Sequence, residues 1–163
     1  MNIKVMRYAN EDIPAMVDIW NGVIEDGVAF PQEDFLDEVS ATEFFAQQTY
    51  TAVAKDTDSN EVCGLYILHP NNVGRCGHIC NTSYAVNSSH RSKGIGEMLV
   101  RDSLIKGREC GFSILQFNAV VASNTYARKL YKKLGFIQLG VIPKGFRMKD
   151  GHYEDICPYY IEL

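Results

Sequence analysis

The fold is decided by the stretch from Tyr84 to Val100, which reads YAVNSSHRSKGIGEMLV. Its first residues have the pattern of a strand end, and the Asn and Ser residues that follow favour a turn. Ile95, Met98 and Leu99 then repeat at helical spacing. A helix N-terminus carries unpaired backbone N–H groups and a partial positive charge, and glycines let a ligand come close. The sequence therefore predicts an anion site between a strand and a helix.

Spacing separates three kinds of phosphate-binding loop. A Walker A loop has its Lys after the second glycine, whereas Lys93 precedes both glycines. The dinucleotide fingerprint needs a small residue where Leu99 stands. The pattern that remains is Arg/Gln-x-x-Gly-x-Gly/Ala over Arg91–Gly96, which resembles the acyl-CoA pyrophosphate loop of the GNAT superfamily of N-acyltransferases. The alternative is an ordinary connection in which the glycines serve the turn.

Length and composition bound the class of protein. The 163 residues, 46% hydrophobic and 22% charged, suit one globular domain over residues 1–163 without repeats. A net charge of -4 disfavours a nucleic-acid partner, because such binding depends on Lys and Arg. We expect no membrane partner, because no long apolar run occurs. The five cysteines, an odd number, indicate a reducing cytoplasm.

Hydrophobic periodicity predicts an α/β domain. We expect Asn10 to cap the first helix and Ser40 to Glu43 to form a capping box for the second, with residues 35–39 left open as its extension. Gly111 and Gly135 suit the ends of the third and fourth helices. The predicted strands are 3–7, 50–55, 62–68, 78–86, 113–120, 136–141 and 153–161, and the predicted helices are 13–24, 40–48, 94 or 95 to about 110, and 124–134.

A second motif strengthens the resemblance. Residues Asn124–Phe136, which read NTYARKLYKKLGF, are similar to the second GNAT signature, and the order of elements matches the GNAT fold along the whole chain. The resemblance implies a single GNAT-like domain with a mixed, mostly antiparallel sheet of about seven strands and about four helices. It also implies acetyl-CoA as co-substrate.

The resemblance assigns the residues that would hold acetyl-CoA. The diphosphate would lie against the loop, and pantetheine would bond to main-chain groups of the preceding strand. Asn124 would bond the pantetheine arm, and its alternative role is a helix N-cap. Core packing is the alternative for the Tyr84 side chain. The expected cofactor-binding residues are Tyr84, Val86, Arg91, Ser92, Lys93, Gly94, Ile95, Gly96 and Asn124.

The resemblance also assigns a general acid. Tyr131 would protonate the CoA thiolate, and plain core packing is its alternative. Many relatives carry a Glu as base on the strand before the loop, but the corresponding places here are Cys80 and Asn81, which are not acidic. Our catalytic candidates are Tyr131, Glu25 and Asn81, with Glu25 the first choice of base. Other candidates for the base are Asp26, His78, Glu154 and Asp155.

Three soft ligands alternate at Cys76, His78 and Cys80, but without a fourth partner we expect no metal. Cys80 as a nucleophile has equally little support, since nothing in the sequence indicates a lowered thiol pKa.

The sequence thus predicts an N-acetyltransferase that acts on a primary amine of a small molecule. Ile19–Phe30 and Gly145–Tyr160 are similar to GNAT enzymes of the phosphinothricin type, which act on amino-acid-like amines. Residues Lys149–Asp155 depart from the consensus of those relatives, so an amino acid or analogue is an expectation and the substrate stays open. Two alternatives stay open: a protein or peptide N-acetyltransferase, and a non-catalytic acyl-CoA sensor. Dimers are frequent in the family, so a homodimer is a further expectation.

Overall fold

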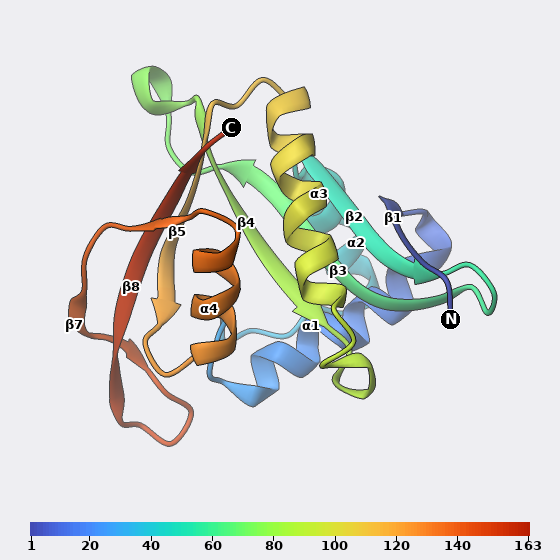
Figure 1. Cartoon of the computed structure of the whole chain (residues 1–163). Helices are drawn as coiled ribbons and strands as arrows, with labels where there is room; N and C mark the ends of the chain where they lie inside the picture. The colour runs from blue at the N-terminus through green and yellow to red at the C-terminus, as the bar shows by residue number, and fades with distance from the viewer.

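Alternating and β-branched segments assemble into a mixed sheet of eight strands in the computed structural model, which describes residues 1–163 (Figure 1). The strand order is β1-β2-β3-β4-β5-β8-β6, and β7 also pairs with β8. Only the β4–β5 pair is parallel, which confirms the mostly antiparallel sheet. The strands are β1 (Ile3–Arg7), β2 (Tyr50–Asp56), β3 (Glu61–Pro70), β4 (Ile79–Val86), β5 (Ile114–Val121), β6 (Ile137–Gln138), β7 (Ile142–Arg147) and β8 (Tyr153–Glu162).

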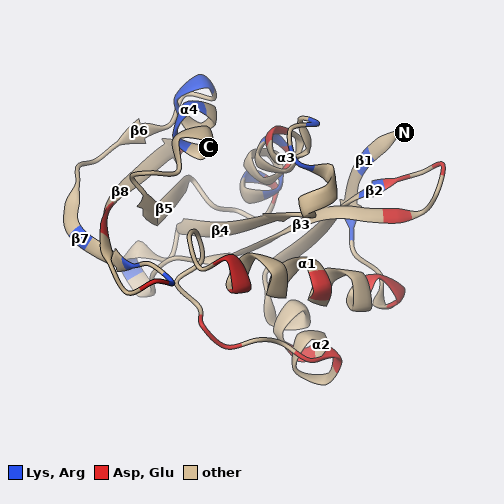
Figure 2. Cartoon of the chain, turned by 90° about the horizontal axis from the view of Figure 1, so that it is seen from below, with Lys and Arg blue, Asp and Glu red and all other residues tan.

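Four α-helices cover the sheet, as predicted. They are α1 (Ile13–Asp26), α2 (Glu38–Gln47), α3 (Ile95–Glu109) and α4 (Thr125–Lys133). Figure 2 shows α1 and α2 on one face and α3 and α4 on the other. None of the helices combines the length and the hydropathy that crossing a membrane requires.

Each face of the sheet has its own apolar core. Trp20 of α1 lies at the centre of one core, with its ring 4.6 Å from that of Phe30 and 5.3 Å from that of Phe44. Leu99 of α3 is fully buried in the other core. Gly64 of β3 lets α3 lie close to the sheet, because a Cβ there would come within 3.2 Å of the Leu99 side chain.

The predicted caps of the first two helices were wrong. Asn10 lies in a short 3-10 turn (Asn10–Asp12), and α1 begins at Ile13. Asp37 caps α2: its carboxylate accepts from Ser40 N at 2.7 Å, and Ser40 Oγ accepts from Asp37 N at 3.0 Å. Ser40 is thus the third residue of the helix, because the reciprocal pair with Asp37 starts the helix earlier.

The eighth strand was not predicted. Residues 136–141 contain only the short β6, and β7 follows over Ile142–Arg147. β7 includes Pro143, Lys144 at φ 54° and Gly145, residues that are typical of a turn. It forms a strand because pairing with β8 outweighs these local preferences.

Candidate active site

The sheet opens between its two parallel strands. β4 pairs with β5 only at Ile79 opposite Ile114 and at Cys80 opposite Leu115. β4 then continues beside β3 as far as Val86, while β5 continues beside β8 (Figure 1). The second half of β4 therefore has a partner on one side only.

Main-chain groups of β4 line this opening. Asn71 N donates to Ile79 O at 2.8 Å, and Asn87 N donates to Cys63 O at 2.9 Å. Hydrogen-bonded positions of an antiparallel pair alternate, so the odd-numbered residues of β4 direct their main-chain groups toward β3. The main-chain groups of Tyr84 and Val86 consequently face the opening, where no β5 partner is available.

A cavity of about 370 Å³ fills the opening and reaches α4. Its walls include Asn81 of β4, Phe117 of β5 and Tyr131 of α4, and none of its lining residues is Asp, Glu, Lys or Arg. A second hollow, of about 590 Å³, lies at the start of α3. The two are continuous, because they share the residues Ala29, Tyr84, Val86, Gly96, Asn124 and Tyr126.

The start of α3 has the features of an anion-binding terminus. Gly94 is its N-cap at φ 77° and supplies no capping side chain, so the first N–H groups of the helix lack a side-chain partner. A Cβ at Gly94 would meet nothing within 4 Å, and one at Gly96 would lie 3.8 Å from the Tyr126 hydroxyl. The space into which a side chain would project is therefore open at Gly94, and at Gly96 it is bounded only by an ordinary contact with Tyr126.

The basic residues of the loop are exposed. Arg91 Nη2 lies 2.8 Å from Asp26 Oδ2, and Lys93 has no ion-pair partner. Glu97, the acidic residue in the first turn of α3, is compensated. Its hydrogen bonds to Lys133 and then to Arg101 hold the pKa of the Glu97 carboxyl below its usual range.

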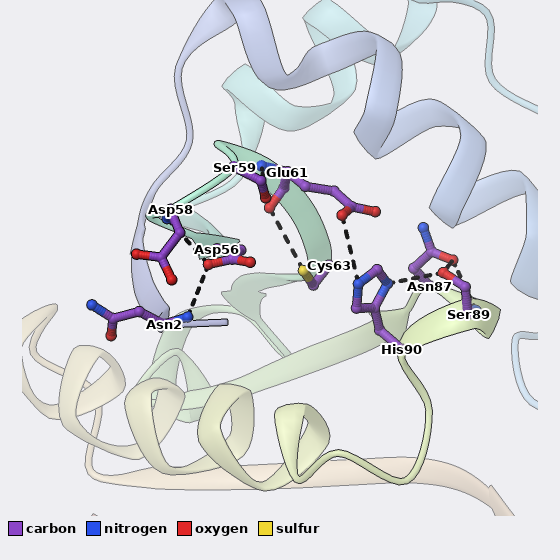
Figure 3. Close-up of polar contacts among 9 residues, drawn as sticks. All are labelled: Asn2, Asp56, Asp58, Ser59, Glu61, Cys63, Asn87, Ser89 and His90. Carbon is purple, nitrogen blue, oxygen red and sulfur yellow. Dashed lines mark hydrogen bonds and ion pairs between the residues drawn. The ribbon is translucent and has the colours of Figure 1, made fainter.

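Side chains that had no predicted role hold this loop in place (Figure 3). Asn87 Oδ1 accepts from Ser89 N at 3.0 Å, and the buried His90 ring is 2.9 Å from Ser89 Oγ. His90 Nε2 also faces Glu61 Oε2 of the β2–β3 hairpin at 3.7 Å. The loop is therefore fixed against the hairpin as well as against α1.

Tyr131 lies among aromatic rings with a free hydroxyl. Its ring centroid is 4.4 Å from that of Phe117 and 5.8 Å from that of Tyr159, and its hydroxyl makes no hydrogen bond within the protein. Burial raises the pKa of the Tyr131 hydroxyl above its ordinary value. The structure thus places a protonated hydroxyl on the wall of the cavity.

Two other predicted residues have structural roles in addition to lining the cavity. Asn124 Oδ1 accepts from Ala127 N at 3.3 Å and caps α4, while Asn124 also lines both cavity and hollow. The Tyr84 hydroxyl is 2.7 Å from both Thr82 Oγ1 and Ser103 Oγ. The Tyr84 side chain therefore packs beneath α3, and what remains available from this residue is its main chain.

Most candidates for the base lie away from the Tyr131 cavity. Glu25 pairs with Lys149 Nζ at 2.8 Å and lines a separate hollow of about 630 Å³. Asp26 is engaged by Arg91. His78 is exposed and lines neither the cavity nor the hollow at α3.

The two acidic candidates near the C-terminus are also engaged elsewhere. Asp155 accepts from Lys144 N at 3.0 Å, and Glu154 is 3.2 Å from His152 Nε2. Neither carboxylate lines the cavity.

The structure brings Asn81 and a histidine that sequence reasoning missed to the same cavity. His69 of β3 pairs with Asn81 of β4 in the sheet register, and both line the cavity. Asn81 Nδ2 donates to Asn71 Oδ1 at 3.1 Å. In the sequence, His69 merely ends an apolar strand. The register of β3 against β4 is the signal that could have connected the two residues.

No group of three or more His, Cys, Asp or Glu side chains is arranged to hold a metal ion. Burial raises the pKa of the Cys80 thiol to about 12, so this thiol is a poor nucleophile.

Comparison with known proteins agrees with this geometry. The model of the acetyltransferase (GNAT) family matches residues 16–136, which include the opened strands, the loop and α4. The chain belongs to the GNAT family. The GNAT domain also aligns with the N-acetyltransferase aca1 of Schizosaccharomyces pombe, at 42% identity over 89 residues, or 55% of this chain. The chain spans only 42% of the length of that relative.

Solved structures show the same GNAT fold. A GCN5-related N-acetyltransferase from Kribbella flavida is 28% identical, with a TM-score of 0.90 over 99% of this chain and 98% of that one. A phosphinothricin acetyltransferase from Sinorhizobium meliloti, solved in complex with acetyl-CoA, is 20% identical. Its TM-score is 0.90 over 100% of this chain and 89% of that one.

Proposed function

We propose that this GNAT protein transfers the acetyl group of acetyl-CoA to a primary amine of a small molecule, by direct attack of the amine on the thioester. The observation that carries the proposal is the opening between β4 and β5. It offers unpaired main-chain groups, leads to an uncapped helix N-terminus, and contains the free hydroxyl of Tyr131.

The continuous cavity and hollow suit the length of acetyl-CoA. The diphosphate lies at the loop, where Ser92, Gly94, Ile95 and Gly96 offer backbone N–H groups, and Arg91 and Lys93 add charge at the rim. Pantetheine lies along β4 and bonds to the main chains of Tyr84 and Val86. Asn124, on the wall of both spaces, bonds the arm from α4.

Tyr131 is the general acid of the proposed reaction. A tyrosine hydroxyl is protonated at neutral pH, and burial raises the pKa of Tyr131 further, so the hydroxyl has a proton to give to the departing thiolate. A well-positioned acid of this kind contributes about 100- to 10,000-fold in rate.

The acceptor is an amino acid or an analogue. The side of the cavity formed by Phe30, Pro31 and Gln32 also borders the hollow that contains Arg147 and Lys149. Arg147 and Lys149 are paired there with Glu33 and Glu25, so the proposal of an amino acid or analogue rests on the similarity of Ile19–Phe30 and Gly145–Tyr160 to GNAT enzymes of the phosphinothricin type. The GNAT resemblance and the odd number of cysteines support a cytoplasmic enzyme, and a homodimer is part of the proposal.

A non-catalytic acyl-CoA sensor is the second candidate. It is favoured by one observation, the absence of any carboxylate base among the residues that line the cavity. The sensor would bind acetyl-CoA and release no thiol.

The test is thiol release from acetyl-CoA with a panel of amino acids, polyamines, aminoglycosides and short peptides, alongside a direct measurement of acetyl-CoA affinity. Turnover with an amino acid or analogue is the expected result. Turnover with peptides alone would instead support a protein acetyltransferase. Tight binding without turnover of any amine would support the sensor, and an absence of binding would overturn both.

A further inference from the structure

We infer that His69 is the general base that takes the proton from the acceptor ammonium, an inference that rests on the proposed acetyl transfer. The titratable side chains that line the cavity are His69 and the tyrosines Tyr84, Tyr126 and Tyr131. Of these residue types, histidine alone ordinarily changes its charge near neutral pH. Asn81 of β4, Asn118 of β5 and Gln32 line the cavity with amides that do not titrate.

Hydrogen bonding leaves one ring nitrogen of His69 free. Nδ1 lies 2.9 Å from Pro70 O, and a carbonyl oxygen can only accept, so Nδ1 carries the hydrogen of the neutral ring. Nε2 has no hydrogen-bond partner within the protein and keeps its lone pair. The imidazole is therefore in the tautomer that can accept a proton at Nε2.

The side chains of His69 and Tyr131 lie on opposite faces of the sheet. Leu65 and Ile67 of β3 belong to the core beneath α1 and α2, so alternation directs the His69 side chain to that same face. Tyr131 packs against the core on the other face, beneath α3 and α4. A thioester held in the opening is then reached by the amine from one face, while the thiol departs toward the other.

Asn81 positions the ammonium beside His69. The two residues form a register pair, and alternation puts their side chains on the same face. Asn81 Nδ2 donates to Asn71 Oδ1, which also accepts from Asn118 Nδ2 at 2.7 Å. Asn81 Oδ1 has no partner in the protein, so it can accept an N–H of the ammonium. An amide cannot itself act as a base, and the neighbouring histidine supplies the basicity.

The protons of the reaction are balanced by His69 and Tyr131. His69 Nε2 takes one proton from the ammonium, and the nitrogen lone pair forms the C–N bond at the thioester carbonyl carbon. The C–S bond breaks with its electron pair on sulfur, and Tyr131 protonates that sulfur. The second proton lost by nitrogen restores Tyr131, and His69 returns its proton to water. One thioester and one ammonium become one amide, one thiol and one proton.

The test compares His69→Gln with His78→Gln, a matched change at an exposed histidine outside the cavity. We expect His69→Gln to lower kcat/KM by about 100- to 10,000-fold while acetyl-CoA affinity stays unchanged. The wild-type pH profile of kcat/KM should have an ascending limb. The His69 variant should lose this limb, and the His78 variant should keep it. His69→Asn, a second variant, should behave like His69→Gln.

An acceptor of low basicity separates proton removal from a structural role. Trifluoroethylamine is largely deprotonated at neutral pH and needs no base, so the His69 variant should lose far less activity with it than with an ordinary alkylamine. An equal loss of activity with both amines, or a pH profile of the His69 variant like that of the wild type, would overturn the assignment of His69. Turnover by the wild type would in that case still support the proposed function. If the wild-type protein binds acetyl-CoA but turns over no amine, both the role of His69 and the proposed acetyl transfer are overturned.

Discussion

Tyr131 combines an aromatic environment with a hydroxyl that no protein group engages. Tyr131→Phe keeps the ring and removes only the acid, so we expect kcat to fall by about 100- to 10,000-fold with little change in acetyl-CoA Kd. Tyr153→Phe, at an exposed tyrosine on β8, is the control and should keep full activity. Steady-state kinetics with calorimetric binding will decide, and an unchanged kcat would exclude Tyr131 from the chemistry.

The pH profile follows from the same hydroxyl. A raised pKa means that the protonated, active form of Tyr131 persists above the pH at which an ordinary tyrosine ionises. We therefore expect kcat to show no descending limb up to about pH 10, the ordinary tyrosine value. Measurement of kcat from pH 6 to 10 at saturating substrates tests this, and a fall centred near pH 8 would contradict it.

At the same scale, Tyr131 and Asn124 were predicted as site residues and line the cavity, whereas His69 lines the same cavity and was not predicted. The first two lie in a local motif whose spacing is visible along the chain. His69 gains its setting from a strand partner, Asn81, that lies 12 positions away in sequence and opposite in register. Glu25 illustrates the converse, because its pairing with Lys149 depends on how α1 meets the end of β7. Long-range contacts of this kind are not encoded in local patterns.

Among the elements, the start of α1 is tied to β2 by a buried ion pair. Lys55 Nζ lies 2.6 Å from Asp12 Oδ1, with side chains that are 8% and 5% exposed. Lys55→Met would leave Asp12 buried and uncompensated, which should lower the free energy of unfolding by about 3–5 kcal/mol. Lys4→Met, at an exposed lysine of β1, should change it by less than about 0.5 kcal/mol.

Denaturant titration of both variants provides the measurement. The double variant Lys55→Met/Asp12→Asn should be less destabilised than the sum of its single changes, because it leaves no buried charge unpaired. Equal stability of Lys55→Met and Lys4→Met would contradict the argument.

The element that forms the cradle, the N-terminus of α3, gives a second test. Gly96→Leu should fold, since a Cβ there makes only an ordinary contact with Tyr126, but its longer side chain would enter the space assigned to the diphosphate. We expect acetyl-CoA Kd to rise by about 100-fold or more, a loss of about 2.7 kcal/mol. Gly96→Ala is the matched control and should bind much more tightly than the Leu variant. Retained affinity in Gly96→Leu would contradict the loop assignment.

The same scale shows where local signals suffice. Strands β1 to β5 and helices α3 and α4 lie within a few residues of their predicted positions, because each has a clear hydrophobic period, and a Gly follows each of the two helices closely. The cap of α2 was misplaced, since Asp37 and Ser40 compete for that role and only their mutual hydrogen bonds decide it. β7 was not predicted because its own residues favour a turn, and it forms a strand only by pairing with β8.

For the molecule as a whole, two ion pairs fasten the last turn of α1 and the segment after it to the end of β7 and the residues that follow it. Arg147 pairs with Glu33, and Lys149 pairs with Glu25, while Lys149 N donates to Gly27 O at 3.2 Å. These charges are exposed, so replacing both cations with Gln should change the free energy of unfolding by less than about 1 kcal/mol. The wall at residues 30–32 should nevertheless loosen and raise the acceptor KM.

Hydrogen exchange across residues 27–37 measures this loosening, and kinetics give the acceptor KM. Arg101→Gln, which removes an exposed ion pair on α3, is the control and should leave both unchanged. Faster exchange without any change in KM would show that the wall plays no part in binding the acceptor.

The opening between β4 and β5 has a consequence for how such proteins diverge. A ligand that binds to backbone groups in the opening does not depend on which side chains β4 carries, as long as the path of the strand is unchanged. Mutation can then exchange the walls around it, and with them the acceptor, without erasing the site. Such divergence would keep the fold while the sequence changes, as in the Sinorhizobium meliloti structure, which superposes on this chain with a TM-score of 0.90 at 20% identity.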